Sequence, residues 1–545
     1  MDRDYFIGWT EKVDSSSTVR DPLGLWHHLN IQIDYTPGIT SGTSKIRYYT
    51  LLCWYYQNLF EHRIVNHDEF ERLFILACLS HHKGDYKDPG IRNLFNIQRF
   101  KDHWKDIEQF KLDFQINGFA RTYYNRQISI LRCCWTDILG DIHQTSINRE
   151  LANCLSAVDI DFFRNIIFTK DMVLTHMTDF CLCKHNDKEI EIMSQLLFGF
   201  IKNQDNDWII DENSYTDFIQ RSIIDFSFEG EKLDTDNPLE ESAFDELSRR
   251  RRNTLFLFLK IINEVQPSTA DFKKAIYDAL YFRRKIYTRG PINFNPLSRV
   301  VDYWEFLQLN EYYVFAIEII LDIIQNKVKN NNGLPMDSIF SSCDPLKIMS
   351  QIGTRTKTSL DLNLTLREML AQAERGFASF DESDAFDSIS SSQNDEETLG
   401  DLVILLVLLK QRYHRISNEI KKASRNEREY EIDNRLLIQD LFDFVEKNPD
   451  MKVIAFLSLI FAWVVRRHLY ESAIRYRQNN TKNWLFVEDN GRLFFSRRRS
   501  IRIHPRDNRW DAIASLMKDI DMIQYGTNIT LTSKGILWLE KAGLT

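Results

Sequence analysis

Proline and glycine are scarce in this sequence: its 545 residues include only 11 Pro and 19 Gly. Both residues interrupt regular structure, so their scarcity favours long helices over a sandwich of short strands joined by tight turns. A chain of this length is too long for one hydrophobic core, which predicts several domains. We therefore expect a mainly α, multi-domain helical protein.

Residues 481–545 depart from this helical pattern. Two strand-like runs surround Asp489-Asn490-Gly491, a strong signal for a tight turn. The expected elements are strands at 484–487 and 493–495, a helix at 510–520, a hairpin at 522–531 and a helix at 533–542. This order is the plan of a winged helix, so we predict a winged-helix-like α+β module at the C-terminus.

The same segment carries a local excess of positive charge. The whole chain has a formal charge of −9, yet residues 492–509 contain seven arginines and one acid, Asp507. Such a cluster is typical of phosphate contacts, which give salt-dependent binding with weak sequence preference. The candidate nucleic-acid-binding residues are Arg492, Arg497, Arg498, Arg499, Arg502, Arg506, Arg509 and Lys518. A protein-docking module whose arginines pair with acidic groups explains the pattern equally well.

Changes in composition suggest the domain boundaries. The expected parts are an N-terminal helical domain at 1–140, a central helical domain at 141–375, an acidic Ser-rich linker or mobile loop at 376–400, a helical segment at 401–480 and the winged-helix-like module at 481–545. The linker is predicted because acids and serines replace any periodic apolar face. The apolar run Val453–Val465 is shorter than the roughly 20 residues of a membrane span, so we expect a buried helix.

The N-terminal residues and the cysteines indicate in which cellular compartment the protein is located. The first residues lack the basic start and apolar core of a signal peptide. Eight cysteines are present, and their spacing forms no disulfide framework. We therefore expect a cytoplasmic protein with reduced thiols.

Two short stretches contain possible metal ligands. Cys181 and Cys183, with His185 close behind, are soft ligands that zinc accepts in principle. A structural zinc site normally adds a second paired cluster, and Cys343 is the only cysteine further along, so a helix end before a polar turn is preferred.

The stretch from Leu79 to Asp85 is similar to the His-Asp helix of metal-dependent phosphohydrolases. However, His82 stands where that helix needs an aspartate, so an exposed helix end is the preferred interpretation. The sequence thus predicts no metal and no cofactor.

Three further basic stretches have a structural and a functional interpretation. Arg249–Arg252 point around a whole helix, which favours a solvated, salt-bridged helix start over a nucleic-acid contact. Between residues 273 and 289, basic and aromatic residues alternate, which fits a helical core better than a single-strand-binding surface. Lys45 and Arg47 follow a loop of small residues, where a helix start is favoured over a phosphate site.

A resemblance to known proteins begins near the N-terminus. The motifs are Asp21-Pro22-Leu23-Gly24, Pro37-Gly38-Ile39-Thr40, Arg47-Tyr48-Tyr49 and Cys53-Trp54. This pattern, over about the first 140 residues, resembles the start of large uncharacterised bacterial proteins encoded in phage-defence gene clusters. The resemblance implies an accessory or sensor component that works with other proteins, and it supplies no catalytic residue.

No catalytic motif accompanies these features: Gly-x-Ser-x-Gly, Walker, dinucleotide-binding and His-Glu-x-x-His patterns are all missing from the sequence. We expect a non-enzymatic DNA-binding or scaffolding subunit of a multi-protein bacterial complex, and the resemblance implies a role in anti-phage defence. Its expected partners are other protein subunits and, through the basic module, DNA, but no membrane. The alternative is a metal-dependent nuclease or hydrolase whose site is assembled from distant residues.

Overall fold

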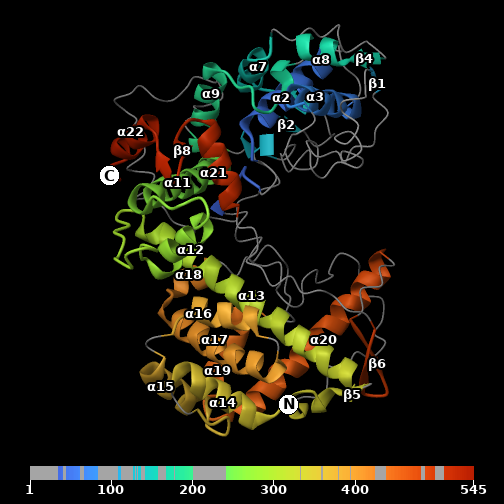
Figure 1. Cartoon of the computed structure of the whole chain (residues 1–545), viewed down its shortest axis with the longest axis vertical. Coiled ribbons are helices and arrows are strands. Elements are labelled where there is room, and N and C mark those ends of the chain that lie inside the picture. Colours follow the sequence, from blue (N-terminus) through green and yellow to red (C-terminus); the bar gives the residue numbers. More distant parts are fainter. Residues whose placement is uncertain are drawn as a thin grey trace. The chain divides into compact units, whose positions relative to one another are not determined.

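A computed structural model gives the fold. It describes residues 35–40, 44–61, 67–83, 109–111, 127–136 except 129 and 132, 142–156, 167–199 except 177, 241–331, 333–357, 360–377, 380–392, 394–423, 437–479, 485–496 and 509–545. The chain forms two compact units: unit 1 is Met1–Ile31 with Asp302–Arg506, and unit 2 is Gln32–Val301 with Asp507–Thr545. Both are built mainly from helices with a few short antiparallel strands (Figure 1), which confirms the predicted fold class.

This division differs from the domains expected from the sequence. The expected boundary after residue 140 lies inside unit 2, and residues 401–480 belong to the same unit as residues 302–375. The module expected at 481–545 is divided between the two units after Arg506. Each unit is therefore assembled from separate stretches of sequence.

Unit 1 is organised around one buried helix. Its described helices are α13 (Ser298–Asn330, in this unit from Asp302 onward), α14 (Pro345–Thr356), α15 (Leu366–Gly376), α16 (Glu382–Ser391), α17 (Asp395–Arg415), α18 (Asn418–Ala423), α19 (Ile438–Lys447) and α20 (Val453–Asn479). Every residue of α17 from Leu399 to Lys410 is buried, and α14, α15 and α16 pack against it (Figure 1).

Residues 376–400 are not a linker, so that prediction is wrong. They contain α16 and the start of α17. Asp381 accepts hydrogen bonds from two backbone N–H groups at the start of α16, which gives this helix a capping box. Glu382 is buried and pairs with Arg412 at 2.7 Å, while Ile389 is buried on the same helix. The acids that suggested a solvated linker instead cap helices and form ion pairs.

Helix α20 includes Val453–Ala473, a stretch long and apolar enough to cross a membrane, and no other described helix meets this criterion. Half of this stretch is buried, and Arg466 and Arg467 interrupt it. Core helices of globular domains have the same length and composition. The burial favours the core helix expected at Val453–Val465.

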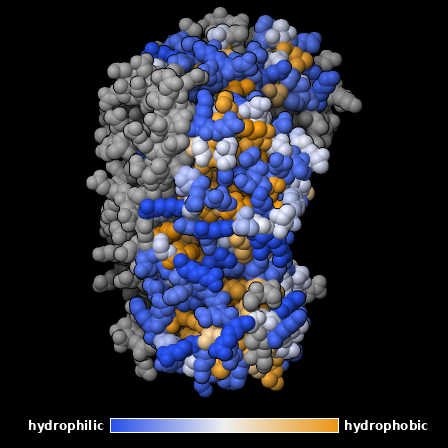
Figure 2. All heavy atoms as spheres, turned by 90° about the vertical axis from the view of Figure 1, so that its left-hand side faces the viewer, coloured by the Kyte–Doolittle hydropathy of each residue, from blue (hydrophilic) through white to orange (hydrophobic). Residues whose placement is uncertain are grey.

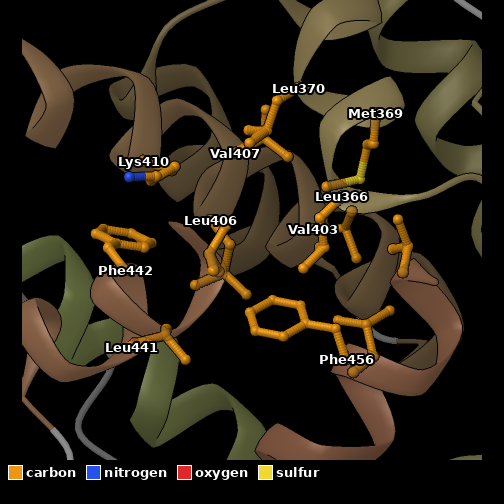
Figure 3. Close-up of a pocket in the computed structure, with 13 residues that line it drawn as sticks. Leu366, Met369, Leu370, Val403, Leu406, Val407, Lys410, Leu441, Phe442 and Phe456 are labelled. Atoms are coloured by element: carbon orange, nitrogen blue, oxygen red, sulfur yellow. The ribbon is translucent and has the colours of Figure 1, made fainter. Parts of the chain in front are cut away.

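A small apolar pocket lies among α15, α17, α19 and α20 (Figure 3). Its lining includes Leu406, Phe442 and Phe456, and Lys410 is the only charged residue of the lining. Lys410 pairs with Glu446, and its ammonium lies 5.7 Å from the centre of the Phe442 ring. Because this cation is already neutralised, the pocket is a gap in the core and offers no free charge to a ligand.

Unit 1 also contains a three-stranded antiparallel sheet, in the order β5 (Leu334–Pro335), β7 (Arg492–Phe495) and β6 (Phe486–Asp489). The predicted hairpin at 484–495 is confirmed as β6 and β7. Asn490 and Gly491 both have positive φ, 51° and 76°, as the predicted tight turn requires.

In its described residues, unit 2 combines helices of 7 to 25 residues with three antiparallel strand pairs. Its helices are α2 (Ile46–Phe60), α3 (His67–His81), α7 (Ser146–Asn153), α8 (Lys170–His176), α9 (Asp187–Phe198), α11 (Glu241–Val265), α12 (Phe272–Phe282), α21 (Trp510–Asp519) and α22 (Ser533–Lys541), with a 3₁₀ turn, η3 (Thr178–Phe180). The pairs are β1 (Gln109–Lys111) with β4 (Ile167–Thr169), β2 (Cys134–Thr136) with β3 (Ile142–Gln144), and β8 (Ile523–Tyr525) with β9 (Ile529–Leu531).

The C-terminal elements α21, β8, β9 and α22 match the predicted helix, hairpin and helix, and they complete the core of unit 2. Trp510 of α21 is 1% exposed and stacks on Phe258 of α11, with ring centres 6.1 Å apart. Trp538 of α22 meets Phe198 of α9 edge-on at 4.6 Å. These elements share a unit with α9 and α11, whereas the β6–β7 hairpin belongs to unit 1.

Buried arginines hold several of these elements. Arg251 is fully buried and donates to the carbonyls of Leu197, Pro37 and Leu196 at 2.6, 2.9 and 3.1 Å. Arg252 donates to two further carbonyls at the end of α9. The last carbonyls of a helix have no intrahelical donor, so these guanidinium groups cap α9. The prediction of a solvated helix start at Arg249–Arg252 is therefore wrong for its last three residues, which are all buried.

Candidate metal centre

Two histidines stand at the end of α3. His81 is the last residue of the helix, and His82 follows it, with its backbone N–H bonded to the carbonyl of Cys78 at 3.0 Å. Lys83 then adopts positive φ, 53°, which ends the helix in a left-handed residue. Both imidazoles are partly exposed.

Two cysteines follow η3. Backbone hydrogen bonds from Cys181 to Thr178 and from Lys184 to Cys181, at 3.0 and 2.9 Å, fold this segment into two successive turns. Cys181 is buried and Cys183 is exposed. The turns place both sulfurs on the side of α3.

An aromatic cluster positions α3 and η3 against each other. Phe180 of η3 meets Trp54 of α2 at 4.9 Å and Phe70 of α3 at 6.2 Å between ring centres. Tyr55 stacks on Phe70 at 4.9 Å. Buried aromatic pairs of this kind stabilise a fold by more than the burial of their apolar area. This packing holds the histidine pair and the cysteine pair next to each other.

The ligand atoms of His81, His82, Cys181 and Cys183 all lie within 4.8 Å of one another. We refer to these four residues as the Cys2His2 cluster. The Cys183 sulfur lies 3.3 Å from Nδ1 of His81 and 3.4 Å from the Cys181 sulfur. The edges of a tetrahedral zinc site with two sulfurs and two nitrogens are about 3.3–3.8 Å long, from the usual zinc–ligand distances. These two separations are close to such edges, and no two ligand atoms of the cluster lie more than 4.8 Å apart.

The surroundings of the two sulfurs are unequal. A hydrogen bond with Cys78 lowers the pKa of Cys181, whereas burial and the neighbouring Cys181 charge raise the pKa of Cys183. A divalent cation held between the sulfurs would favour both thiolates, because it offsets the repulsion between them. Two thiolates and two imidazoles are the donor set that zinc prefers.

The sequence indicated no second pair of possible ligands beside Cys181 and Cys183. The structure brings one there, made of histidines, with 102 positions between His81 and Cys183. His185, the third ligand considered from the sequence, is not part of the cluster. Burial lowers the pKa of His185, and the charge of Asp519 acts in the opposite direction.

The predicted basic residues that the structure describes are divided between the two units: Arg492 is in unit 1, and Arg509 and Lys518 are in unit 2. Arg492 is exposed and donates to the Gly333 carbonyl at 3.1 Å. Lys518 is exposed and lies 5.1 Å from the ring centre of Tyr525. Arg509 is 8% exposed and donates to the Thr36 hydroxyl at 2.9 Å, so it is a structural residue and unsuited to a phosphate contact. Five candidates lie outside the described residues: Arg497, Arg498, Arg499, Arg502 and Arg506.

The other basic stretches are largely neutralised. Lys273 pairs with Asp511 at 2.6 Å, and Lys285 pairs with Glu264 at 2.8 Å. Lys45 pairs with Asp519 at 3.1 Å and Arg47 with Glu189 at 2.9 Å, which leaves neither cation for a phosphate. On the face in Figure 2, hydrophobic residues form scattered patches among hydrophilic ones. The Cys2His2 cluster is therefore the best-defined candidate site in the described part of the chain.

No protein-family model, curated protein or solved structure matches this chain. The fold and the site alone define its class: a mainly helical protein of two units, with a candidate Cys2His2 metal centre in unit 2.

Proposed function

We propose that this protein is a non-enzymatic helical subunit in which a zinc ion, held by the Cys2His2 cluster, stabilises unit 2. The observation that carries the proposal is the convergence of the four ligand atoms within 4.8 Å. Such an ion joins the end of α3 to the turn after η3, two segments far apart in sequence. Structural zinc adds its binding energy to folding energy in this way.

The ligand number favours a structural ion over the alternative of a metal-dependent nuclease or hydrolase. Catalytic zinc keeps one coordination position open for water, whereas structural zinc is closed by four protein ligands. The cluster offers four ligands, two of them thiolates, which fill a tetrahedral shell. Asp85, which ends the stretch similar to a phosphohydrolase helix, lies outside the residues that the structure describes.

Metal analysis of the purified full-length chain tests this proposal. We expect about one zinc per chain, lost on Cys181→Ser and on His81→Ala. Cys154→Ser is the matched control: its sulfur donates only to the Glu150 carbonyl, a bond that serine can also make, so zinc should be retained. A wild-type chain without zinc, or one whose zinc content survives both ligand substitutions, would overturn the proposal.

A scaffolding subunit binds other molecules, and we propose that this chain binds DNA. The support is the excess of arginine in residues 492–509, together with the exposure of Arg492 and Lys518. The resemblance of the first 140 residues to proteins of phage-defence clusters favours a place in a multi-protein bacterial complex. An acidic protein subunit is the competing partner.

Fluorescence anisotropy with labelled duplex DNA tests the docking partner. Changing Arg497, Arg498, Arg499 and Arg502 to Gln should weaken binding and flatten its salt dependence, since each phosphate contact adds about −0.9 to the slope of log K against log salt. The control removes the same charge from exposed residues of unit 1: Lys347, Lys357, Arg367 and Arg375. Equal binding by both variants would exclude DNA docking through this segment.

A further inference from the structure

The two sulfurs of the Cys2His2 cluster are arranged to react with each other. Their separation, 3.4 Å, is only about 1.4 Å longer than a disulfide bond of about 2.05 Å. Cys183 is exposed, while Cys181 is buried behind it. An oxidant from solvent therefore reaches Cys183 first and finds a second sulfur next to it.

We propose that the cluster is a peroxide-sensitive switch, in which Cys181 and Cys183 form a disulfide and the bound metal is released. This inference rests on the metal site proposed above. The switch would regulate that site: unit 2 keeps the metal that links its two segments under reducing conditions and loses it when peroxide is present.

The reaction balances with hydrogen peroxide as the two-electron oxidant. The Cys183 thiolate attacks one peroxide oxygen, the O–O bond breaks, and a sulfenic acid and hydroxide form. The Cys181 thiolate then attacks the Cys183 sulfur, the S–O bond breaks, and a second hydroxide leaves as the disulfide forms. Two solvent protons convert the hydroxides to water. The metal has then lost two of its four ligands, and the two histidines alone hold it weakly.

Cys78 could compete with Cys183 as the disulfide partner of Cys181, and the two possible disulfides have different consequences for the metal. Its sulfur accepts a hydrogen bond from the Leu182 N–H at 3.4 Å and hydrogen-bonds with Cys181. It is not one of the four ligands, and it is fully buried. A disulfide between Cys78 and Cys181 would leave Cys183 on the metal, whereas the proposed disulfide removes both thiolates.

The experiment treats the reduced, zinc-loaded full-length chain with hydrogen peroxide. A chromogenic chelator follows zinc release, and mass spectrometry of peptides locates the cross-link. We expect the wild type to release its zinc as a Cys181–Cys183 disulfide forms, and thiol reductant with added zinc to restore the metal. Cys183→His keeps four ligands but lacks the exposed thiol, so it should retain zinc through the same treatment.

Cys78→Ser serves as the second variant, since serine can still accept the Leu182 N–H. It should bind zinc and release it as the wild type does. A Cys78–Cys181 cross-link, or zinc release from Cys183→His as fast as from the wild type, would overturn the switch while leaving the metal site intact. A reduced wild type without zinc would instead overturn the proposed metal site.

Discussion

Arginine has an unusual role at the scale of single residues. Arg251 and Arg509 are both buried: Arg251 donates to backbone carbonyls, and Arg509 donates to the Ile39 carbonyl and the Thr36 hydroxyl. Carbonyls at helix ends and in irregular segments need donors, and one guanidinium can serve several at once. Burial lowers the pKa of Arg251 to about 10, so the group stays charged at neutral pH. A run of arginines in this chain is therefore as much a structural device as a binding surface.

Substitution of Arg251 tests this role. Arg251→Met removes the guanidinium donor from the carbonyls of Leu197 and Pro37, and we expect the free energy of unfolding to fall by about 3 kcal/mol. Urea denaturation measures it. The control is Arg249→Ala, whose side chain is 29% exposed and pairs with Glu246 at 3.4 Å; it should cost less than about 1 kcal/mol. Equal effects of the two substitutions would show that Arg251 is not a cap.

Glu189 makes the stability of unit 2 depend on pH. It is fully buried on α9, and burial raises its pKa from 4.5 to about 7, against the opposing effect of Arg47. A raised pKa stabilises the folded state fully below the unfolded value of 4.5, and this contribution is lost as pH rises through 7.

The wild type should therefore lose stability relative to Glu189→Gln between pH 5 and pH 8, by up to about 3 kcal/mol. Urea denaturation of both proteins at the two pH values measures the difference. Asp519 and His185, whose pKa values burial also shifts, lie in the same region and are present in both proteins, so the difference between the proteins reports on Glu189. A difference that is the same at both pH values would contradict the prediction.

At the scale of elements, close packing of α14 on α17 depends on a glycine. A Cβ at Gly400 would lie 2.8 Å from Cβ of Gln351 and 3.1 Å from the Ile348 carbonyl. Neither atom can rotate away freely. We expect Gly400→Ala to destabilise the chain by about 1–3 kcal/mol, although alanine is the better helix former.

Thermal denaturation of Gly400→Ala and of a control, Gly526→Ala, measures this effect. The nearest atom to a Cβ at Gly526 is the Asn528 carbonyl oxygen at 3.7 Å, an ordinary contact, so this change should stay within about 0.5 kcal/mol. A neutral or stabilising effect of Gly400→Ala would contradict the prediction, because it would mean that α14 and α17 can accommodate the extra methyl group.

The elements were well predicted where the pattern is local. Tight-turn residues located the β6–β7 hairpin, and the amphipathic runs after Arg509 located α21 and α22. The acidic stretch was misjudged because its acids cap and pair inside the fold: Glu396, for example, meets Lys327 of α13 at 2.6 Å. Composition alone does not distinguish an acid that faces solvent from one that faces a distant lysine.

The candidate site depended on contacts that sequence spacing does not reveal. Each pair of ligands was recognised in isolation, as two adjacent histidines and as a Cys-x-Cys. Their partnership follows from the packing of Phe180 against Trp54 and Phe70, which brings η3 to α3. The burial of Arg509 was equally hidden, because its acceptors at Thr36 and Ile39 lie more than 400 positions away.

At the scale of the whole molecule, residues 481–545 are divided between two units, and from this division we predict how the segment folds. A winged-helix module would fold by itself, with its hairpin packed on its helices. Here β7 pairs with β5, a strand from residues 334–335, and α21 depends on α11, where Phe258 stacks on Trp510. The separated fragment 481–545 lacks both partners, so its hairpin is an isolated pair and its helices expose their apolar faces.

We therefore expect the fragment 481–545 to be unfolded in solution, with little chemical-shift dispersion in its amide NMR spectrum. The chain cut after Arg506 should in turn lose the core contacts that α21 and α22 make in unit 2, and limited proteolysis should attack residues 32–301 faster than in the full-length protein. Well-dispersed amide signals from the fragment would contradict this prediction, because they would show that the segment folds independently, as a winged helix does. The same outcome would remove the reason for testing DNA binding only in the full-length chain, since the arginines of 492–509 would then sit on an autonomous domain.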